Sequence, residues 1–287
     1  MKVQNRALSF LIVAVVYILA AGAGIGVYVA LKEHLPFWLN LLIADVAATV
    51  VTFIFSLIFK NASVYDPYWS VQPIVILVAY ACFNSLNLPG ILILVAVLVW
   101  GIRLTANWAY TFKDLTRQDW RYTMLKERTG KGYFFVNFTG IHLVPTLVVY
   151  GCTLPAVFVF IYRPDFNAGV AIFCAVSLLA ATLQGIADCT MHKFRKSGKG
   201  GFIREGVWKY SRHPNYLGEI VMWWGIALAT VCIMPQRWWL IAGAVANTLL
   251  FLCISIPLAD GKQSKKDGWA EYKKNTWMLL PVYKKQK

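Results

Sequence analysis

The stretch from Ala7 to Leu31, ALSFLIVAVVYILAAGAGIGVYVAL, contains no charged residue in 25 positions. A bilayer-spanning α-helix needs roughly 20 apolar residues, because each residue rises 1.5 Å through a hydrocarbon core about 30 Å thick. A secretory signal has a shorter apolar core of about 7–15 residues. The stretch is therefore predicted to be a retained transmembrane helix. Its Gly22 and Gly26 are four residues apart, a spacing that favours close packing against a second helix.

The rest of the 287-residue chain repeats this apolar pattern. Hydrophobic residues make up 59% of it and charged residues only 14%, whereas about a quarter of the residues in soluble domains are charged. We identify eight apolar segments: Ala7–Leu31, Pro36–Phe59, Trp69–Phe83, Ile91–Tyr110, Phe134–Tyr162, Ala168–Asp188, Tyr216–Met234 and Trp238–Pro257. The third is the shortest. The predicted fold class is all-α, a polytopic bundle of about 7–8 transmembrane helices.

The distribution of basic residues predicts the orientation of these helices. If the N-terminus is cytosolic and the chain crosses eight times, 24 of the 28 Lys and Arg residues fall on the cytosolic side. Six of them lie between the fourth and fifth segments, seven between the sixth and seventh, and eight after the last. Cytosolic loops carry such an excess of positive charge. We therefore predict that both termini face the cytosol, in the plasma membrane or the endoplasmic reticulum.

Composition also argues against several classes of protein. The net charge of +15 is explained by loops that face anionic lipid headgroups, and because it is divided among those loops, nucleic-acid binding is disfavoured. The six cysteines lie in or beside apolar runs without a CxxC spacing, and the four histidines are scattered. We therefore predict neither a disulfide framework nor a metal site. Residues 1–287 are expected to form one membrane domain, with the lipid-substrate side in 1–110 and the cofactor side in 111–287.

Polar residues within the apolar segments indicate where function lies, because each costs on the order of 2.5–3.5 kcal/mol at a membrane helix centre. We expect Asp45 and Asn247 to hydrogen-bond a neighbouring helix and His142 to be a core histidine. Most of the others fall in the cytosolic halves of their segments, which predicts one polar cavity open to the cytosol. They are Gln72, Arg103, Asn107, Gln184, Asp188, Asn215 and Glu219. Gln184 and Asp188 are four residues apart, as are Asn215 and Glu219, so each pair shares a helix face.

The segment between Asp188 and Glu219 has the composition of a site for an anionic, aromatic ligand. It contains a run of basic residues, three glycines at 198, 200 and 201, and the aromatic residues Trp208, Tyr210 and Tyr216. Guanidinium groups suit phosphates, and glycines let the backbone approach a ligand closely. Pro214 suits the first position of a helix. A dinucleotide fits these groups better than a single phosphate does.

The run from Trp208 to Glu219, WKYSRHPNYLGE, resembles the signature of the steroid 5α-reductase-like superfamily, in particular its bacterial and lower-eukaryotic branch known as a domain of unknown function. Sterol C14 and C7 reductases and isoprenylcysteine carboxyl methyltransferases carry related runs. Further segments resemble motifs of the same branch: Asp66–Trp69, Trp100–Leu104, Asp119–Tyr122, and Tyr272 with Thr276 and Pro281.

This resemblance implies a helical membrane reductase that holds NADPH between its C-terminal helices and faces the cytosol. It places Gln184, Asp188, Arg195, Asn215 and Glu219 against the cofactor. It also suggests contacts to phosphate, ribose or adenine from Arg103, Arg121, Tyr210, Arg212, His213 and Tyr216. The substrate would be a steroid-, sterol- or polyprenoid-like lipid that enters from the bilayer near the early helices. Hydride would pass to an activated carbon–carbon double bond.

The sequence departs from the steroid 5α-reductases at the substrate end. Those enzymes polarise a carbonyl with a glutamate and a tyrosine, but Trp100 stands where the tyrosine is expected. Asp66 and Tyr68 are the nearest candidates for a proton-donating catalytic pair. Two alternatives stay open: a membrane S-adenosylmethionine-dependent methyltransferase, because Arg-His-Pro is shared with that family, and a lipid-binding membrane protein without catalysis.

Overall fold

The computed structural model describes residues 3–280 and residue 282. Lys2, Pro281 and the three lysines at positions 284, 285 and 287, which entered the predictions of orientation and of the terminal motif, lie outside the described residues. The described chain is helical, with a single isolated β-bridge between Ser211 and Trp277. The prediction of an all-α fold is therefore confirmed.

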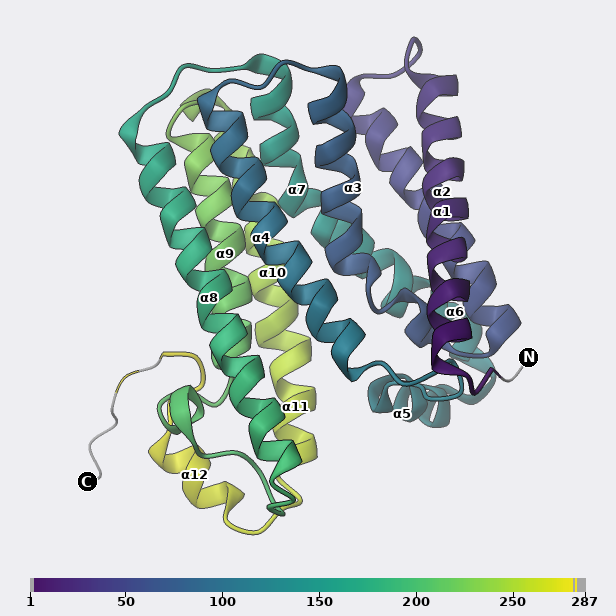
Figure 1. The fold of residues 1–287 in the computed structure, drawn as a ribbon, viewed down its shortest axis with the longest axis vertical. Coiled ribbons are helices and arrows are strands. Elements are labelled where there is room, and N and C mark those ends of the chain that lie inside the picture. The colour runs from purple at the N-terminus through teal and green to yellow at the C-terminus, as the bar shows by residue number, and fades with distance from the viewer. Residues whose placement is uncertain (1–2, 281, 283–287) are drawn as a thin grey trace. The chain divides into compact units, whose positions relative to one another are not determined.

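The helices follow one another with short connections (Figure 1). In chain order they are α1 (Arg6–Leu31), α2 (Phe37–Phe59), η1 (Ala62–Tyr65), α3 (Tyr68–Phe83), α4 (Leu88–Thr111), α5 (Trp120–Thr129), η2 (Gly130–Gly132), α6 (Tyr133–Val136), η3 (Asn137–Leu143), α7 (Val144–Tyr162), α8 (Ala168–Lys196), η4 (Gly206–Lys209), α9 (Pro214–Val231), η5 (Pro235–Ile241), α10 (Ala242–Leu250), η6 (Phe251–Ser255), α11 (Ile256–Gln263) and α12 (Trp269–Asn275). The predicted start of a helix at Pro214 is confirmed.

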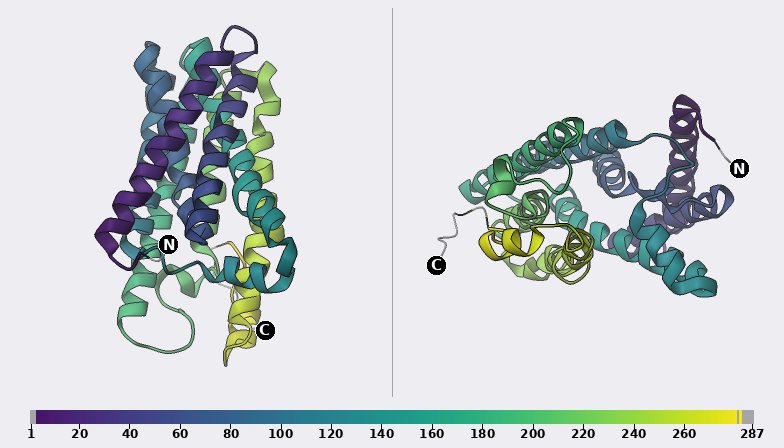
Figure 2. Two further views of the ribbon diagram at one scale, coloured as in Figure 1. Left: turned by 90° about the vertical axis from the view of Figure 1, so that its right-hand side faces the viewer. Right: turned by 90° about the horizontal axis from the view of Figure 1, so that it is seen from below.

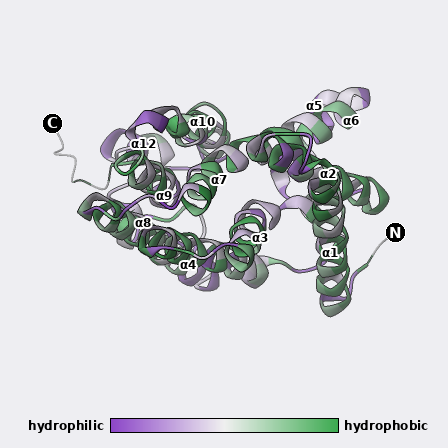
Figure 3. Cartoon of the chain, turned by 90° about the horizontal axis from the view of Figure 1, so that it is seen from above, coloured by the Kyte–Doolittle hydropathy of each residue, from purple (hydrophilic) through white to green (hydrophobic). Residues whose placement is uncertain are grey.

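Among the described residues, six helical segments are long and apolar enough to cross a membrane: Arg6–Leu31, Phe37–Phe59, Leu88–Thr111, Trp120–Tyr162, Ala168–Lys196 and Pro235–Gln263. Hydrophobic residues run along α1 and α2 in Figure 3. The protein is therefore an integral membrane protein. The remaining two predicted spans correspond to α3, which has only 16 residues, and to α9, which carries Asn215 and Glu219 in its first turns. The count of 7–8 spans and the orientation of the termini stay predictions.

The chain divides into two compact units that are interleaved in sequence. Unit 1 contains residues Met1–Ala79 and Leu104–Leu154, and unit 2 contains Tyr80–Arg103 and Pro155–Lys287. The long helices α4 and α7 each contribute to both units. The boundary between the units falls within α4 at Leu104, and the expected lipid-substrate side in 1–110 and cofactor side in 111–287 stay predictions.

Unit 1 is organised around the pair α1 and α2. A Cβ atom added at Gly24 would lie 3.1 Å from the Ala44 carbonyl oxygen of α2, so this glycine permits the close approach. At Gly22 and Gly26 an added Cβ would meet no atom within 4 Å. The prediction that those two glycines pack against a second helix was therefore wrong. Their four-residue spacing is helical, but the rotation of α1 points Gly24 toward α2 instead.

Unit 2 is organised around α8 and α9, which lie side by side in Figures 1 and 2. An added Cβ at Gly218 would lie 2.7 Å from the Ala180 carbonyl oxygen, and one at Gly225 would lie 2.8 Å from that of Phe173. These glycines are seven residues apart on one face of α9, so the two backbones touch along two turns. Ser177 strengthens the contact by donating a hydrogen bond to the Met222 carbonyl oxygen at 3.0 Å.

Candidate functional site

A charged network joins α4 and α8 in unit 2. Arg103 of α4 donates from Nη1 to Asp188 Oδ2 at 2.6 Å and from Nη2 to the side-chain oxygen of Gln184. Gln184 and Asp188 are one turn apart on α8, so a single guanidinium reaches both. The side chains of Arg103 and Asp188 are less than one fifth exposed. The predicted common face of Gln184 and Asp188 is confirmed, and its direct partner is Arg103.

Glu219 lies in the first turns of α9 and is held by two indoles. Trp100 of α4 donates from Nε1 to Glu219 Oε2 at 2.8 Å, and Trp223 donates to Oε1 at 3.0 Å. The two tryptophan rings meet edge-on, with their centroids 4.8 Å apart. The carboxylate is thus oriented by neutral donors on both oxygens. Trp100 is one of these donors.

Several buried polar atoms near this network have no hydrogen-bond partner in the described residues. They include the side-chain nitrogen Nε2 of Gln184 and the side-chain oxygen Oδ1 of Asn215. Gln184 packs against Gly218 of α9, one turn beyond Asn215. Buried polar atoms are rarely left unpaired, because each lost hydrogen bond costs roughly 1–3 kcal/mol. Asn215 Oδ1 is therefore an acceptor without a partner among the described residues, and Gln184 Nε2 is a donor that a ligand would share with the neighbouring Glu219 carboxylate.

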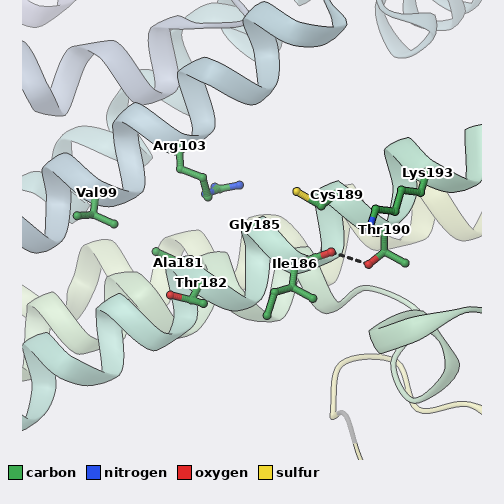
Figure 4. Close-up of a pocket in the computed structure, with 9 residues that line it drawn as sticks. All are labelled: Val99, Arg103, Ala181, Thr182, Gly185, Ile186, Cys189, Thr190 and Lys193. Atoms are coloured by element: carbon green, nitrogen blue, oxygen red, sulfur yellow. Dashed lines mark hydrogen bonds between the residues drawn. The ribbon is translucent and has the colours of Figure 1, made fainter. Parts of the chain in front are cut away.

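A groove of about 520 Å³ runs between α4 and α8 beside the network (Figure 4). Val99 and Arg103 form its α4 wall. The α8 wall consists of Ala181, Thr182, Gly185, Ile186, Cys189, Thr190 and Lys193. The volume lies within the roughly 300–1,000 Å³ of small-molecule sites. Arg103 is thus shared between the groove and the contacts with Gln184 and Asp188.

The structure gives Arg212 and His213 a different setting from the predicted one. Arg212 Nη1 donates to the carbonyl oxygens of Thr276 at 2.6 Å and Lys273 at 3.2 Å. His213 Nε2 lies 2.8 Å from Asp260 Oδ1, and Arg212 Nη2 lies 3.5 Å from Oδ2. All three side chains are nearly buried. Arg212 and His213 therefore attach the C-terminal segment to the start of α9, and within the described residues Arg212 Nε has no hydrogen-bond partner.

The other predicted cofactor contacts fall into three settings. Tyr216 stacks on His213, with the ring centroids 5.3 Å apart, and so belongs to the same attachment. Arg195 in the last turn of α8 and Tyr210 before α9 are exposed. Arg121 lies in unit 1, where it pairs with Asp119 at 2.8 Å. The prediction of one polar cavity open to the cytosol stays a prediction, because its residues are divided between the two units.

The two predicted catalytic residues have separate partners in unit 1. The Tyr68 hydroxyl donates a hydrogen bond to Asp45 Oδ1 at 2.8 Å, and Gln72 Nε2 donates one to Asp45 Oδ2 at 2.5 Å. The expectation that Asp45 bonds a neighbouring helix is confirmed, since both donors lie on α3. Asp66, between η1 and α3, accepts a hydrogen bond from the Tyr122 hydroxyl at 2.8 Å. Desolvation raises the pKa of the Asp66 carboxyl to about 7, and the nearby Asp119 carboxylate adds to the rise.

A second group of polar side chains in unit 1 lies beside Tyr68. Tyr65 stacks on Tyr68 and shares a hydrogen bond with Thr146 at 2.8 Å. The His142 ring lies 4.6 Å from that of Tyr65 and is completely buried. It sits in η3, a π-helical turn in which Nδ1 meets the Asn137 carbonyl oxygen at 2.9 Å. The expectation of a satisfied core histidine holds for Nδ1, whereas Nε2 has no partner among the described residues.

Sequence reasoning missed two residues that organise these sites. Trp223 follows Glu219 by one helical turn, a spacing that points to contact between the two side chains. Asp260 is an isolated carboxylate at the end of the last apolar run; its position pointed to a buried partner, which proves to be the Arg212–His213 pair. Asn247, expected to bond a neighbouring helix, has no partner for its Nδ2 among the described residues.

The fold and the site define a polytopic helical membrane protein with a charged polar network between α4, α8 and α9. Residues 52–276 match the family described as "Protein of unknown function (DUF1295)", and the chain belongs to this family. The matched region includes all thirteen predicted site residues. No curated protein and no solved structure matches the chain.

Proposed function

We propose that the protein is an NADPH-dependent reductase of a carbon–carbon double bond in a steroid-, sterol- or polyprenoid-like lipid, with its active site facing the cytosol. The observation that carries this proposal is the pair of unsatisfied amide atoms on α8 and α9, Gln184 Nε2 and Asn215 Oδ1. A nicotinamide carboxamide offers the complementary carbonyl acceptor and N–H donor. The resemblance of the Trp208–Glu219 run to NADPH-dependent membrane reductases supports the same cofactor.

The side chains of unit 2 fit the two ends of a dinucleotide. Gln184 and Asn215 would hold the carboxamide, while Arg103 orients Gln184 through its side-chain oxygen. Glu219 is fixed by Trp100 and Trp223, so its carboxylate is a rigid wall of the same site. Two exposed cations in the last turn of α8, Arg195 and Lys196, suit the phosphates. When bound, NADPH supplies the hydride.

Not every predicted contact fits this assignment. Arg212, His213 and Tyr216 are engaged with Asp260, the C-terminal carbonyl oxygens and one another. We assign them the task of holding α12 and the start of α9 in place, which positions Asn215 and Glu219 at the site. Arg121 stays without a cofactor role, because its guanidinium pairs with Asp119.

Reduction of a double bond also needs a proton, which we propose comes from the predicted pair in unit 1. Asp66 has a pKa of about 7, so about half of its carboxyl groups carry a proton at neutral pH. A general acid works best when its pKa is near the working pH. Tyr68 is hydrogen-bonded to Asp45, which leaves Asp66 as the better of the two candidates to lose its proton.

The proposal is tested by nicotinamide binding to the purified full-length protein in detergent. We expect NADPH to raise the unfolding temperature and the Gln184→Leu and Asn215→Leu variants to lose at least tenfold in affinity. The Asn247→Leu variant is the matched control, since it also removes a buried amide of unit 2 with an unpaired nitrogen. Equal affinity in all four proteins, or no response to NADPH, would contradict the proposal.

The same assay separates the two alternatives. A methyltransferase would be stabilised by S-adenosylmethionine and show no response to NADPH. A lipid-binding protein without catalysis would respond to neither compound. Oxidation of NADPH in the presence of an enone lipid, lost in the Asp66→Asn variant with NADPH binding retained, would support the assigned proton donor.

A further inference from the structure

The groove between α4 and α8 has a floor of small residues. An added Cβ at Gly185 would meet only the Arg103 Cδ atom, at the ordinary contact distance of 3.6 Å. Ala181 lies one turn earlier along the same line of α8. Figure 4 shows Val99 and Arg103 on one wall and the α8 side chains on the other. The side chains on the floor of the groove are therefore too small to fill it.

The surface around the groove is apolar. Ile102 on α4 and Leu179 on α8 are exposed by 60% and 69% of their area. Both helices are among the six segments long and apolar enough to span a membrane. Such a surface faces hydrocarbon chains in a bilayer, so the molecule with direct access to the groove is a lipid.

One end of the groove is positively charged. Lys193 lines this end, in the last turn of α8. It has no ion-pair partner among the described residues, whereas the nearby Lys199 pairs with Glu205 at 2.6 Å. A basic residue at the level of the headgroups attracts anionic lipid. The charge at this end and the apolar walls together match a molecule with an anionic head and a hydrocarbon chain.

We propose that this groove binds one phosphate-bearing membrane lipid, with its headgroup at Lys193 and one chain along Val99, Gly185 and Ile186. The bound chain passes Arg103, whose guanidinium also holds Gln184 and Asp188. Lipid in the groove therefore contacts the network that the proposed cofactor would use. The binding itself does not depend on the proposed reductase activity.

The headgroup contact is tested by native mass spectrometry of the full-length protein in detergent without nucleotide. Dioleoylphosphatidylglycerol and dioleoylphosphatidylcholine are the two probes. We expect tighter retention of the glycerol lipid and a loss of about fivefold in its affinity in Lys193→Gln, the usual effect of one basic residue near a membrane surface. Lys265→Gln, at an exposed lysine outside the groove, is the matched control. Equal retention of both lipids, or equal losses in the two variants, would overturn the headgroup assignment.

The chain contact is tested by filling the groove. Thr182 lies in the groove and its hydroxyl bonds only to the Leu178 carbonyl oxygen of its own helix, so Thr182→Trp removes no contact between helices. We expect this variant to lose at least tenfold in affinity for the glycerol lipid. Leu179→Trp, on the same helix at an exposed apolar position, should retain it. Unchanged affinity of Thr182→Trp for the glycerol lipid would contradict the groove assignment. A normal response of this variant to NADPH would show that loss of lipid binding leaves the reductase proposal untouched.

Discussion

The two units pair their buried carboxyl groups with different kinds of partner. In unit 2, Asp188 is paired with the formal charge of Arg103 at 2.6 Å. In unit 1, Asp45 is paired with the neutral hydroxyl of Tyr68 and the amide of Gln72. A charge pair needs both of its members, whereas a carboxyl held by neutral donors tolerates loss of its charge. We therefore expect the two units to respond differently to the loss of one charged side chain.

The largest expected effect comes from breaking the charge pair of unit 2. Arg103→Met leaves the Asp188 carboxylate without its counter-ion, and removing one partner of a buried pair costs about 3–5 kcal/mol. The double variant Arg103→Met, Asp188→Asn should regain more than half of this loss, because no uncompensated charge remains. Unfolding in sodium dodecyl sulfate titrations gives the stabilities of the wild type, the two single variants and the double variant. Strictly additive losses would show that the pair is not coupled.

Helix packing should also differ between the units. Gly225→Ala forces a Cβ against the Phe173 carbonyl oxygen at 2.8 Å, whereas Gly24→Ala brings one to 3.1 Å from Ala44. We expect Gly225→Ala to cost about 1–3 kcal/mol through overpacking and Gly24→Ala to cost less. Gly22→Ala, where the added Cβ meets open space, is the control, and should stabilise by up to about 1 kcal/mol through helix propensity. A ranking other than this, measured by the same titration, would contradict the packing described.

Because neutral groups hold the Asp45 side chain, we expect an amide in place of this carboxyl to be tolerated. In Asp45→Asn the new oxygen accepts from Tyr68, and Gln72 satisfies the new N–H₂ by turning its unpaired Oε1 inward. We expect a loss below about 1 kcal/mol, whereas Asp45→Leu leaves two buried donors unpaired and should cost about 1–3 kcal/mol. The comparison between the units fails if Asp45→Asn proves as damaging as Arg103→Met.

Unit 1 should also show a pH dependence of its stability, which comes from Asp66. The pKa of Asp66 is about 7 in the folded chain and about 3.9 in an unfolded one, so the folded state binds the proton more tightly. Its contribution to stability is complete below about pH 4 and is lost as the pH rises through 7. Unfolding temperatures of the wild type should therefore fall between pH 5 and 8 more steeply than those of Asp66→Asn. Parallel curves would show that Asp66 does not titrate in this range.

Sequence periodicity and composition were sufficient for the class of fold and for the common face of Gln184 and Asp188. The apolar runs located the long helices, and the four-residue spacing of Gln184 and Asp188 correctly placed both on one face. The family resemblance assigned Arg212 and His213 to the cofactor, which stays a prediction, while among the described residues both side chains contact protein groups. Their actual partners, Asp260 and the carbonyl oxygens of Lys273 and Thr276, lie 47 to 64 residues away in sequence.

The glycines show the same limit of prediction from sequence. Gly22 and Gly26 have a spacing typical of helix contacts, but the rotation of α1 about its axis selects Gly24. Rotation depends on all the side chains that pack against a helix, and a spacing within one helix carries no information about it. For Gly218 and Gly225, likewise, only the register of α9 against α8 revealed the contact.

By itself, the sequence determined that this protein is a helical membrane protein with its basic residues gathered in a few loops, since hydropathy and charge act locally along the chain. Only the tertiary structure decided which polar groups pair: Arg103 with Asp188, Tyr68 with Asp45, and Glu219 with two tryptophans. A buried polar group takes its partner from whichever helix lies beside it. That neighbour is chosen by the packing of the whole unit, which the local pattern does not contain.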